Sequence, residues 1–337
     1  KTVDTTSDWI VQRTGIRNRY IVGEGETTST LATGAARKAL AAAGLTAADV
    51  DLIIVATATP DYTFPATATQ VQAALGVTRG AAFDLQAVCS GFVFGVSVAE
   101  KFIATGSSTC ALVIGAETFS RILDWSDRTT CVLFGDGAAA VVLQATPRDE
   151  GVQLEKLGCY GESREILRIH GIGGAYVHQG RLLGATEWQF EGQDIFKKAV
   201  HGMGSACEDV LRRAGLTPEA IDLVIPHQAN LRIIEFVAKR AGVPMERVYV
   251  NVHRYGNMSA ATVPVALCEA LEEGRIAPGA RLLMPAFGGG LTFCAHLVRW
   301  GTRTQPIGLS SIDLPPSPHS ALELVQRYRR AKGHALT

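Results

Sequence analysis

The chain repeats a combination of helix end and strand at a fixed distance. The segment Ala43-Gly44-Leu45-Thr46 recurs as Ala214-Gly215-Leu216-Thr217, at an offset of 171 (214 − 43). A short apolar strand is expected after each, at residues 51–55 and 222–226, with the same offset (222 − 51). Glycine is a common helix stop, so a single match of this kind would carry little weight.

Further matches follow in the same order in both parts of the chain. Helices are expected to end at Gly76-Val77 and Gly242-Val243, short strands to follow at residues 82–85 and 248–251, and Phe-Gly-x-Gly turns at residues 134–137 and 287–290. Reuse of Ala-Gly-Leu helix ends is common in αβ proteins and is the alternative explanation. Four matches in one order favour an internal duplication.

Each half alternates helices with short strands rich in Val, Ile and Leu, a pattern typical of parallel strands buried between helices. Two such halves stacked back to back predict an α/β fold with five layers, α/β/α/β/α. The expected divisions are residues 1–150 for the first half, 151–301 for the second, and 302–337 for a proline-containing arm with a short helix. Active sites in such folds lie beyond the carboxyl ends of strands.

Composition excludes several classes of protein. Thirty-two basic residues balance 32 acidic ones, which argues against a dedicated nucleic-acid binder. No apolar run is long enough to span a membrane, and the residues after Lys1 do not show the pattern of a signal peptide. The seven cysteines are widely spaced without a CxxC pair, which excludes a disulfide framework and favours a cytoplasmic location. No HExxH or close histidine pair predicts a metal site.

Cys89 is the first candidate for chemistry. It follows the expected strand at residues 82–85 and precedes a helix, in the segment Val88-Cys89-Ser90-Gly91. A cysteine at a helix start is expected to have a lowered pKa and more thiolate character, because the helix dipole favours negative charge there. The alternative is a buried structural cysteine.

Three more segments have the residue types of an active site. His227 directly follows the strand at residues 222–226, and Asn257 opens a helix at the position expected to match Cys89 in the second half. The glycines of Phe287-Gly288-Gly289-Gly290 allow backbone amides to approach a ligand, as in an oxyanion hole or a phosphate cradle. The duplication predicts that these groups face one cleft. Structural roles for each are the alternative.

Taken together, these motifs resemble beta-ketoacyl-acyl carrier protein synthase III, a family of the thiolase superfamily. The resemblance rests on residues 6–17, the Cys89 turn, residues 134–138, 227–234 and 256–260, and the glycine run, and it covers residues 2–300. It departs from the family in three places. The family's opening strand is not found before Lys1, Leu291 stands where an aromatic residue is frequent, and the tail after Thr302 is longer than in the shortest members. The sequence is therefore expected to lack its N-terminal strand.

The resemblance implies a thiolase-like fold and an enzyme that starts fatty-acid chains. Cys89 would take an acyl group from a short acyl-CoA, most simply acetyl-CoA. His227 and Asn257 would hold the malonyl thioester of malonyl-acyl carrier protein during decarboxylation, and the resulting carbanion would attack the acylated cysteine. The N–H groups of Cys89 and Gly289 would form the oxyanion hole. No metal or redox cofactor is implied.

The resemblance also implies binding residues. Trp9 and Arg128 would bracket the adenine of CoA, with Arg13 near its phosphates, and Phe64 of a partner subunit would close the acyl pocket of a homodimer. Gly192, Phe196 and Asn230 would line the tunnel for the pantetheine arm. The expected docking patch for the acidic acyl carrier protein consists of Lys197, Arg232, Lys239 and Arg240. A solvated basic face for Arg13 and an ordinary core position for Phe64 are the alternatives.

The sequence also leaves other functions open. A related Cys-His-Asn condensing enzyme could use a longer or aromatic primer in secondary metabolism, since a few side chains set pocket depth. A simple acyltransferase would stop after loading Cys89, and a carrier-binding scaffold would have no activity. A degradative thiolase needs a second catalytic cysteine, and Cys294 lies inside an expected strand.

Overall fold

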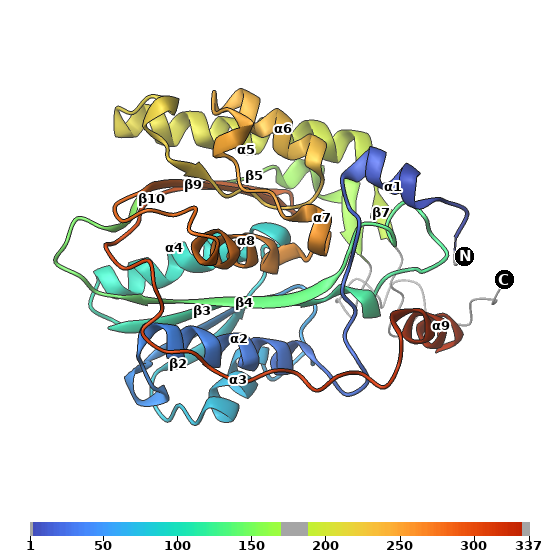
Figure 1. The fold of residues 1–337 in the computed structure, drawn as a ribbon, viewed down its shortest axis with the longest axis horizontal. Helices are drawn as coiled ribbons and strands as arrows, with labels where there is room; N and C mark the ends of the chain where they lie inside the picture. Colours follow the sequence, from blue (N-terminus) through green and yellow to red (C-terminus); the bar gives the residue numbers. More distant parts are fainter. Residues whose placement is uncertain (1–2, 170–187, 332–337) are drawn as a thin grey trace.

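The computed structural model describes residues 3–169 and 188–331, which form two stacked sheets separated and covered by helices (Figure 1). The strands are β1 (Leu52–Ala56), β2 (Ala81–Leu85), β3 (Cys110–Thr118), β4 (Asp136–Gln144), β5 (Gly151–Cys159), β6 (Leu167–Ile169), β7 (Trp188–Phe190), β8 (Leu223–Val224), β9 (Arg281–Gly288) and β10 (Thr292–Arg299). The helices are α1 (Ser7–Thr14), α2 (Thr28–Ala43), α3 (Thr67–Leu75), α4 (Gly91–Ala104), α5 (Gly192–Ala214), α6 (Leu231–Arg240), α7 (Val252–Tyr255), α8 (Thr262–Glu272) and α9 (Ala321–Ala331).

Five layers are visible in Figure 1. Helices α2 and α3 cover sheet 1, whose strand order is β2-β1-β3-β4. Helices α4 and α8 lie between sheet 1 and sheet 2, whose order is β5-β10-β9-β8. Helices α5 and α6 cover the other face of sheet 2. The predicted α/β/α/β/α arrangement is confirmed.

Burial on both faces explains why the strands lack the alternation of apolar and polar residues. In β1, Ile53 packs with α2 and α3 in one apolar cluster, whereas its neighbour Ile54 packs with α4 in another. A third cluster joins α5 and α6 to sheet 2, with Met203 and Leu283 among its buried members. Both faces of each sheet therefore select apolar residues.

The strand registers confirm the duplication. In sheet 1, Leu52 pairs with Ala111, and in sheet 2, Leu223 pairs with Leu282. Both members of the second pair follow their counterparts at the offset of 171 (223 − 52 and 282 − 111). The second half is less regular, because its counterpart of β2 is reduced to a single bridge between Val224 and Val248.

One of the four sequence matches proves to be incidental. The Phe-Gly-x-Gly segment at residues 134–137 leads into β4, whereas the segment at residues 287–290 ends β9. Since β4 corresponds to β10 and β3 to β9, the two segments do not occupy equivalent places. The helix and strand matches carry the duplication without them.

The chain after Thr302 crosses the outer face of α2 before α9 docks near the N-terminus (Figure 1). The Ile307 N–H donates to Ala42 O at 2.9 Å, and Val325 of α9 is buried against Trp125. Ser320 and Glu323 form a capping box at the start of α9, since Ser320 N donates to Glu323 Oε2 at 2.7 Å and Glu323 N donates to Ser320 Oγ at 3.3 Å. In the described part of the chain, no helix combines the length and apolarity needed to cross a membrane.

Candidate active site

Cys89 lies in a tight turn between sheet 1 and the central helix layer. The 3-10 turn Val88–Ser90 joins β2 to α4, as the sequence predicts. Val88 has φ of +48°, a conformation that costs energy for a β-branched residue. The hydroxyl of Ser90 holds the turn by donating to Ala87 O at 2.9 Å. Cys89 is only 6 % exposed.

The glycine run of sheet 2 packs directly against this turn. A Cβ at Gly288 would come within 2.7 Å of both Ala87 O and Cys89 N, closer than real side chains approach. A Cβ at Gly289 would meet the side chain of Val88 at 3.2 Å. Glycine at 288 therefore allows the end of β9 to approach the Cys89 backbone. The predicted approach of these amides to a ligand stays a prediction.

The second half builds the same turn from different residues. Ser259 also has φ of +48°, and it opens the 3-10 turn Ser259–Ala261 before α8. Its offset from Val88 is again 171 (259 − 88), so Ala260 corresponds to Cys89. The prediction that Asn257 matches Cys89 is wrong by three positions, because the second half contains an insertion before this turn.

Asn257 nevertheless reaches Cys89. Its side-chain Oδ1 accepts a hydrogen bond from Ser259 N at 2.8 Å, which fixes the orientation of the amide. The amide NH₂ is then the part that faces the thiol, and Asn257 acts to lower the pKa of Cys89 by hydrogen bonding. An amide donor at this place can stabilise a negative charge next to the sulfur.

His227 follows β8 and is 3 % exposed. Its Nδ1 lies 2.6 Å from Thr262 Oγ1, and the Thr262 hydroxyl donates to Ser259 O at 2.9 Å. Because a carbonyl can only accept, the hydroxyl proton is committed to Ser259, and the imidazole must donate from Nδ1. Burial lowers the pKa of His227 to about 3. The ring is therefore neutral with Nε2 as an acceptor.

The expectation of a thiolate at Cys89 is wrong for the resting protein. Burial is the largest influence and raises the pKa of Cys89 to about 12, against the smaller opposing effects of Ser259 and Asn257. The desolvation cost of a charged sulfur outweighs the helix start. A thiol at rest must lose its proton as it attacks a thioester.

Sequence reasoning missed Glu117, a carboxylate at the end of β3 with 0 % exposure. It accepts hydrogen bonds from Thr59 Oγ1 at 2.6 Å, Thr57 Oγ1 at 3.1 Å and Ala58 N at 3.1 Å, and from Ala260 N at 3.4 Å. Burial raises the pKa of Glu117 to about 7 despite these donors. The sequence offered one signal for this residue, a single acidic side chain near the end of an apolar strand.

The structure brings the three expected adenine and phosphate residues together. The guanidinium carbons of Arg13 and Arg128 lie 5.7 Å and 5.8 Å from the centre of the Trp9 ring, within cation–π range. Arg128 also donates to Asp4 O at 3.1 Å. Trp9 itself is exposed, so this cluster lies at the protein surface.

The expected tunnel residues have separate roles in the fold. Asn230 caps α6 by accepting from Arg232 N at 2.9 Å, and its Nδ2 donates to Arg13 O at 3.1 Å. One amide hydrogen is left for a ligand. Gly192 begins α5, and Phe196 in its first turns contacts Phe236 edge-on, with ring centres 5.5 Å apart.

The four basic residues of the expected docking patch are not equivalent. Arg240 forms a two-point ion pair with Glu208 at 2.8 Å and 3.3 Å, so its charge is already neutralised. Its place in the docking patch stays a prediction, with less free charge than Arg232 or Lys239 has. Lys197 has an exposed pair with Asp194. Arg232 and Lys239 are exposed on α6 and form no ion pair with the residues that the structure describes.

Phe64 lies on an exposed loop and is 84 % accessible, which excludes the core alternative within one chain. Tyr62 of the same loop is also exposed. Among the described residues, no group of three His, Cys, Asp or Glu side chains could hold a metal ion. Cys294 lies buried inside β10, as predicted.

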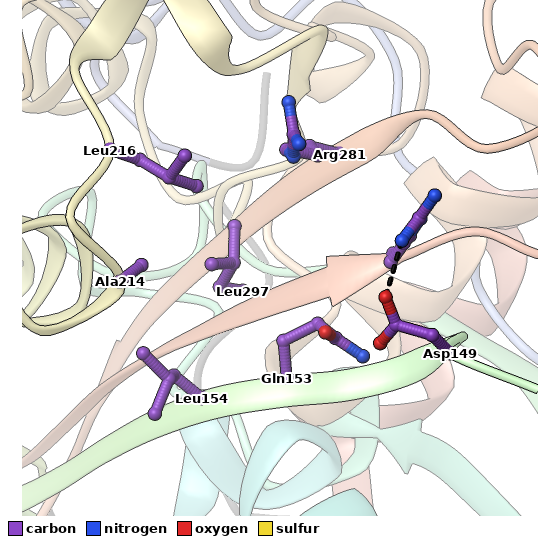
Figure 2. A pocket seen from close by; sticks show the side chains of 8 residues that line it. Asp149, Gln153, Leu154, Ala214, Leu216, Arg281 and Leu297 are labelled. Atoms are coloured by element: carbon purple, nitrogen blue, oxygen red, sulfur yellow. Dashed lines mark hydrogen bonds and ion pairs between the residues drawn. The ribbon is translucent and has the colours of Figure 1, made fainter.

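A separate pocket of about 310 Å³ opens at the other end of sheet 2. Figure 2 shows its lining side chains, among them Arg281, Leu297 and Asp149. Arg281 begins β9, whereas Gly288, next to Cys89, ends it. The pocket is therefore remote from the cysteine, histidine and asparagine cluster.

Models of known families match both halves of the chain. The model for 3-oxoacyl-[acyl-carrier-protein] synthase III matches residues 83–161, which include Cys89 and Glu117. The model for the C-terminal part of the same enzymes matches residues 211–300, which include His227 and Asn257.

Individual relatives agree with these models. A beta-ketoacyl-[acyl-carrier-protein] synthase III of Rhizorhabdus wittichii is 54 % identical over 89 % of this chain and 92 % of its own length. A second such synthase of Vibrio cholerae is 49 % identical over 96 % of this chain and 89 % of its own. The crystal structure of 3-oxoacyl-[acyl-carrier-protein] synthase III from Aquifex aeolicus superposes with a TM-score of 0.83 at 44 % identity, covering 89 % of this chain and 92 % of that one.

Proposed function

The chain belongs to the beta-ketoacyl-[acyl-carrier-protein] synthase III family, and from this premise we propose how its residues carry the reaction. It is an acyltransferase of the condensing type that initiates fatty-acid synthesis. It joins an acyl group from acyl-CoA to malonyl-acyl carrier protein and gives 3-oxoacyl-acyl carrier protein, CoA and CO₂. We take acetyl-CoA as the primer.

Cys89 is the nucleophile of the proposed mechanism. Its turn is held from both sides, by Ser90 within the turn and by Gly288 from sheet 2, so the sulfur has a defined position. Attack on acyl-CoA forms an S–C bond and releases the CoA thiolate. The proton of the thiol has to leave at the same time, since burial keeps the pKa of Cys89 high.

Asn257 and His227 serve the malonyl thioester in the second step. The Asn257 amide is oriented by Ser259 N so that its NH₂ can donate to the thioester oxygen as decarboxylation places negative charge there. His227 can donate from Nε2 only after its proton leaves Nδ1. The Thr262 hydroxyl can serve either tautomer, because it accepts from Nδ1–H or, turned away from Ser259, donates to a bare Nδ1.

The enolate formed by decarboxylation attacks the acyl carbon on Cys89. The N–H groups of Cys89 and Gly289 form the proposed oxyanion hole for that step. Support comes from the close packing of the glycine run on the Cys89 turn, since the backbone at Gly288 lies against the N–H of Cys89.

Acyl-CoA binds, in this proposal, with its adenine on Trp9. Arg128 lies over the same ring and has to move aside to admit the base, which it then covers. Arg13 is placed to meet the phosphates. Gly192 at the start of α5, Phe196 and the spare amide hydrogen of Asn230 line the pantetheine path.

Partners follow from charge and exposure. Arg232 and Lys239 on α6 provide the docking surface for the acidic carrier protein, with Lys197 at its edge. Phe64 closes the acyl pocket of a second copy in a homodimer, which accounts for a phenylalanine exposed to 84 % on one chain. The seven unpaired cysteines suit the reducing cytoplasm.

The convergence of Asn257 and Ser259 on a buried Cys89 is the observation that carries the catalytic assignment. Intact mass after mixing with acetyl-CoA tests it. One acetyl adduct is expected, absent in Cys89→Ala. An adduct that persists in Cys89→Ala would overturn the assignment. An adduct formed only from octanoyl-CoA would favour the secondary-metabolism alternative, which relatives about 50 % identical to this chain do not support.

A further inference from the structure

Glu117 occupies the place in sheet 1 that Gly288 occupies in sheet 2. Since Ala111 corresponds to Leu282, position 117 corresponds to position 288 at the same offset of 171 (288 − 117). Gly288 lies against the backbone N–H of Cys89, and Glu117 reaches the backbone N–H of Ala260, the counterpart of Cys89. A carboxylate thus sits in the first half at the position that corresponds to Gly288, the neighbour of Gly289 in the proposed oxyanion hole.

The environment of Glu117 suits a group that changes its protonation state. Its two oxygens accept from two threonine hydroxyls and two backbone N–H groups, all of them neutral donors. These donors favour the ionised carboxylate, whereas complete burial favours the neutral acid. The opposing effects leave the pKa of Glu117 near 7, within the working range of an enzyme.

Ser259 connects the carboxylate to the nucleophile. Its hydroxyl lies near both groups and lowers the pKa of Cys89 and that of Glu117. The backbone places it there, because Ser259 N donates to Asn257 Oδ1 at 2.8 Å and the next N–H, of Ala260, donates to Glu117 at 3.4 Å. The Oγ atom is buried and has no hydrogen bond of standard geometry, so its donor and acceptor capacity is not used elsewhere. Its backbone, at φ of +48°, is held in an unfavourable conformation in this place.

We propose that Glu117 receives the proton of the Cys89 thiol through the Ser259 hydroxyl during acyl transfer, keeps it while Cys89 is acylated, and returns it after condensation. This inference rests on the proposed role of Cys89 as nucleophile. Glu117 acts through Ser259 and does not touch the substrate, so it is a positioning and proton-holding residue.

The proton count closes over one cycle. In loading, the thiol proton moves to Ser259 Oγ and the Ser259 proton to Glu117, while sulfur forms its bond to the acyl carbon. The CoA thiolate leaves and takes a proton from solvent. After decarboxylation, the enolate forms the new C–C bond, the C–S bond breaks, and the Cys89 thiolate recovers its proton from Glu117 by the same path.

His227 is the competing acceptor, because its Nε2 is unprotonated at rest. Burial holds the pKa of His227 near 3, so an imidazolium there is much less favourable than a protonated Glu117. The titratable groups of the cluster are thus Cys89 on the turn before α4, Glu117 on β3, and His227 after β8, joined through Thr262 and Ser259. Ionised Glu117 also raises the pKa of Cys89, and this penalty disappears when Glu117 takes the proton.

The pH dependence of single-turnover acyl loading, followed by rapid quench and intact mass, tests the proposal. In the wild type, the loading rate is expected to rise with pH and level off with a midpoint near 7. Glu117→Gln and Ser259→Ala should each load at least about 100-fold more slowly, the low end of general acid–base effects. Both should lose this midpoint, and the rate should then rise only in the alkaline range.

Asp136→Asn is the matched control. Asp136 is also a buried carboxylate of sheet 1 with a raised pKa, but it bonds to Ser120 and Val22 rather than to the Cys89 cluster. The control should keep the midpoint. An unchanged midpoint and rate in Ser259→Ala or in folded Glu117→Gln would overturn the proposal, and Ser259→Ala decides if Glu117→Gln does not fold. Loading that survives Cys89→Ala would instead overturn the nucleophile assignment.

Discussion

The hydroxyl of Thr262 lies 2.6 Å from Nδ1 of His227 and, while it donates to Ser259 O, determines the tautomer of that ring in the resting protein. Because the same hydroxyl donates to Ser259 O at 2.9 Å, the imidazole carries its proton on Nδ1 at rest. One threonine thereby connects the histidine of sheet 2 to the turn that presents Ser259 to Cys89. The resting state has an acceptor, rather than a donor, facing the cleft.

Replacing Thr262 by valine should destabilise the protein, and His227 should no longer be restricted to the tautomer with its proton on Nδ1. The change leaves a buried Nδ1–H and a buried carbonyl without a partner, a cost of about 1–3 kcal/mol for each group. Urea unfolding measures the loss, and ¹⁵N shifts of labelled histidine report the tautomer. Thr262→Ser should retain both properties. A wild-type spectrum with the proton on Nε2 would contradict the assignment.

A methyl group at position 288 should impair loading of Cys89. Gly288→Ala places a Cβ 2.7 Å from Cys89 N and Ala87 O, so the turn or β9 must shift. A misplacement of about 1 Å is expected to reduce the loading rate by about 100-fold. Gly34→Ala is the control, because no atom lies within 4 Å of a Cβ at that position of α2 and alanine favours a helix. Equal loading by the two variants would remove Gly288 from the site.

Much of the fold could be predicted because it follows from local pattern. Strands buried on both faces are continuous apolar runs, and a constant spacing between helix ends and strands reveals duplication without any long-range information. Which residue of the second half corresponds to a given residue of the first half could not be predicted in the same way. The offset falls to 166 at Val248 (248 − 82) and returns to 171 at Ser259, so an insertion displaced Asn257 from the position expected for it.

The chemistry of the site depended on burial, which the sequence does not display. The start of α4 favours a thiolate at Cys89, but desolvation reverses that preference. Glu117 was overlooked because an acid at a strand end is normally a surface residue. The ion pair of Arg240 with Glu208 is likewise not visible in the sequence, since it joins α6 to α5 across 32 residues.

A second buried histidine, His296, should make stability depend on pH. It is 0 % exposed, its Nε2 lies 2.7 Å from Ser97 Oγ, and burial lowers its pKa to about 4. The unfolded chain binds a proton near pH 6.5, so the stability contributed by neutral His296 is complete above that pH and is lost as the pH falls toward 4.

The size of this effect is about 1.4 kcal/mol per pH unit within that window. Urea unfolding of the wild type and of His296→Gln at pH 7.5, 6 and 5 measures the contribution of His296 to stability. His227 contributes equally to both proteins, so its effect cancels in the difference between their free energies of unfolding. The stability difference between the two should shrink as the pH falls. A difference that is independent of pH would show that His296 is not held neutral.

Reversing the charge of Arg232 should weaken the encounter with malonyl-acyl carrier protein without affecting acyl-CoA loading. Arg232 is exposed on α6 and, within the described chain, forms no ion pair, so its charge is available to an acidic partner. Arg232→Glu is expected to raise the KM for malonyl-acyl carrier protein by about tenfold, the effect of about 1.4 kcal/mol.

Arg281→Glu makes the same charge change at the opposite end of sheet 2, beside the pocket of Figure 2, and should leave that KM unchanged. Added salt should raise the wild-type KM more than that of Arg232→Glu, because screening acts on the attraction that the variant lacks. Equal KM values for the two charge reversals would remove Arg232 from the docking surface.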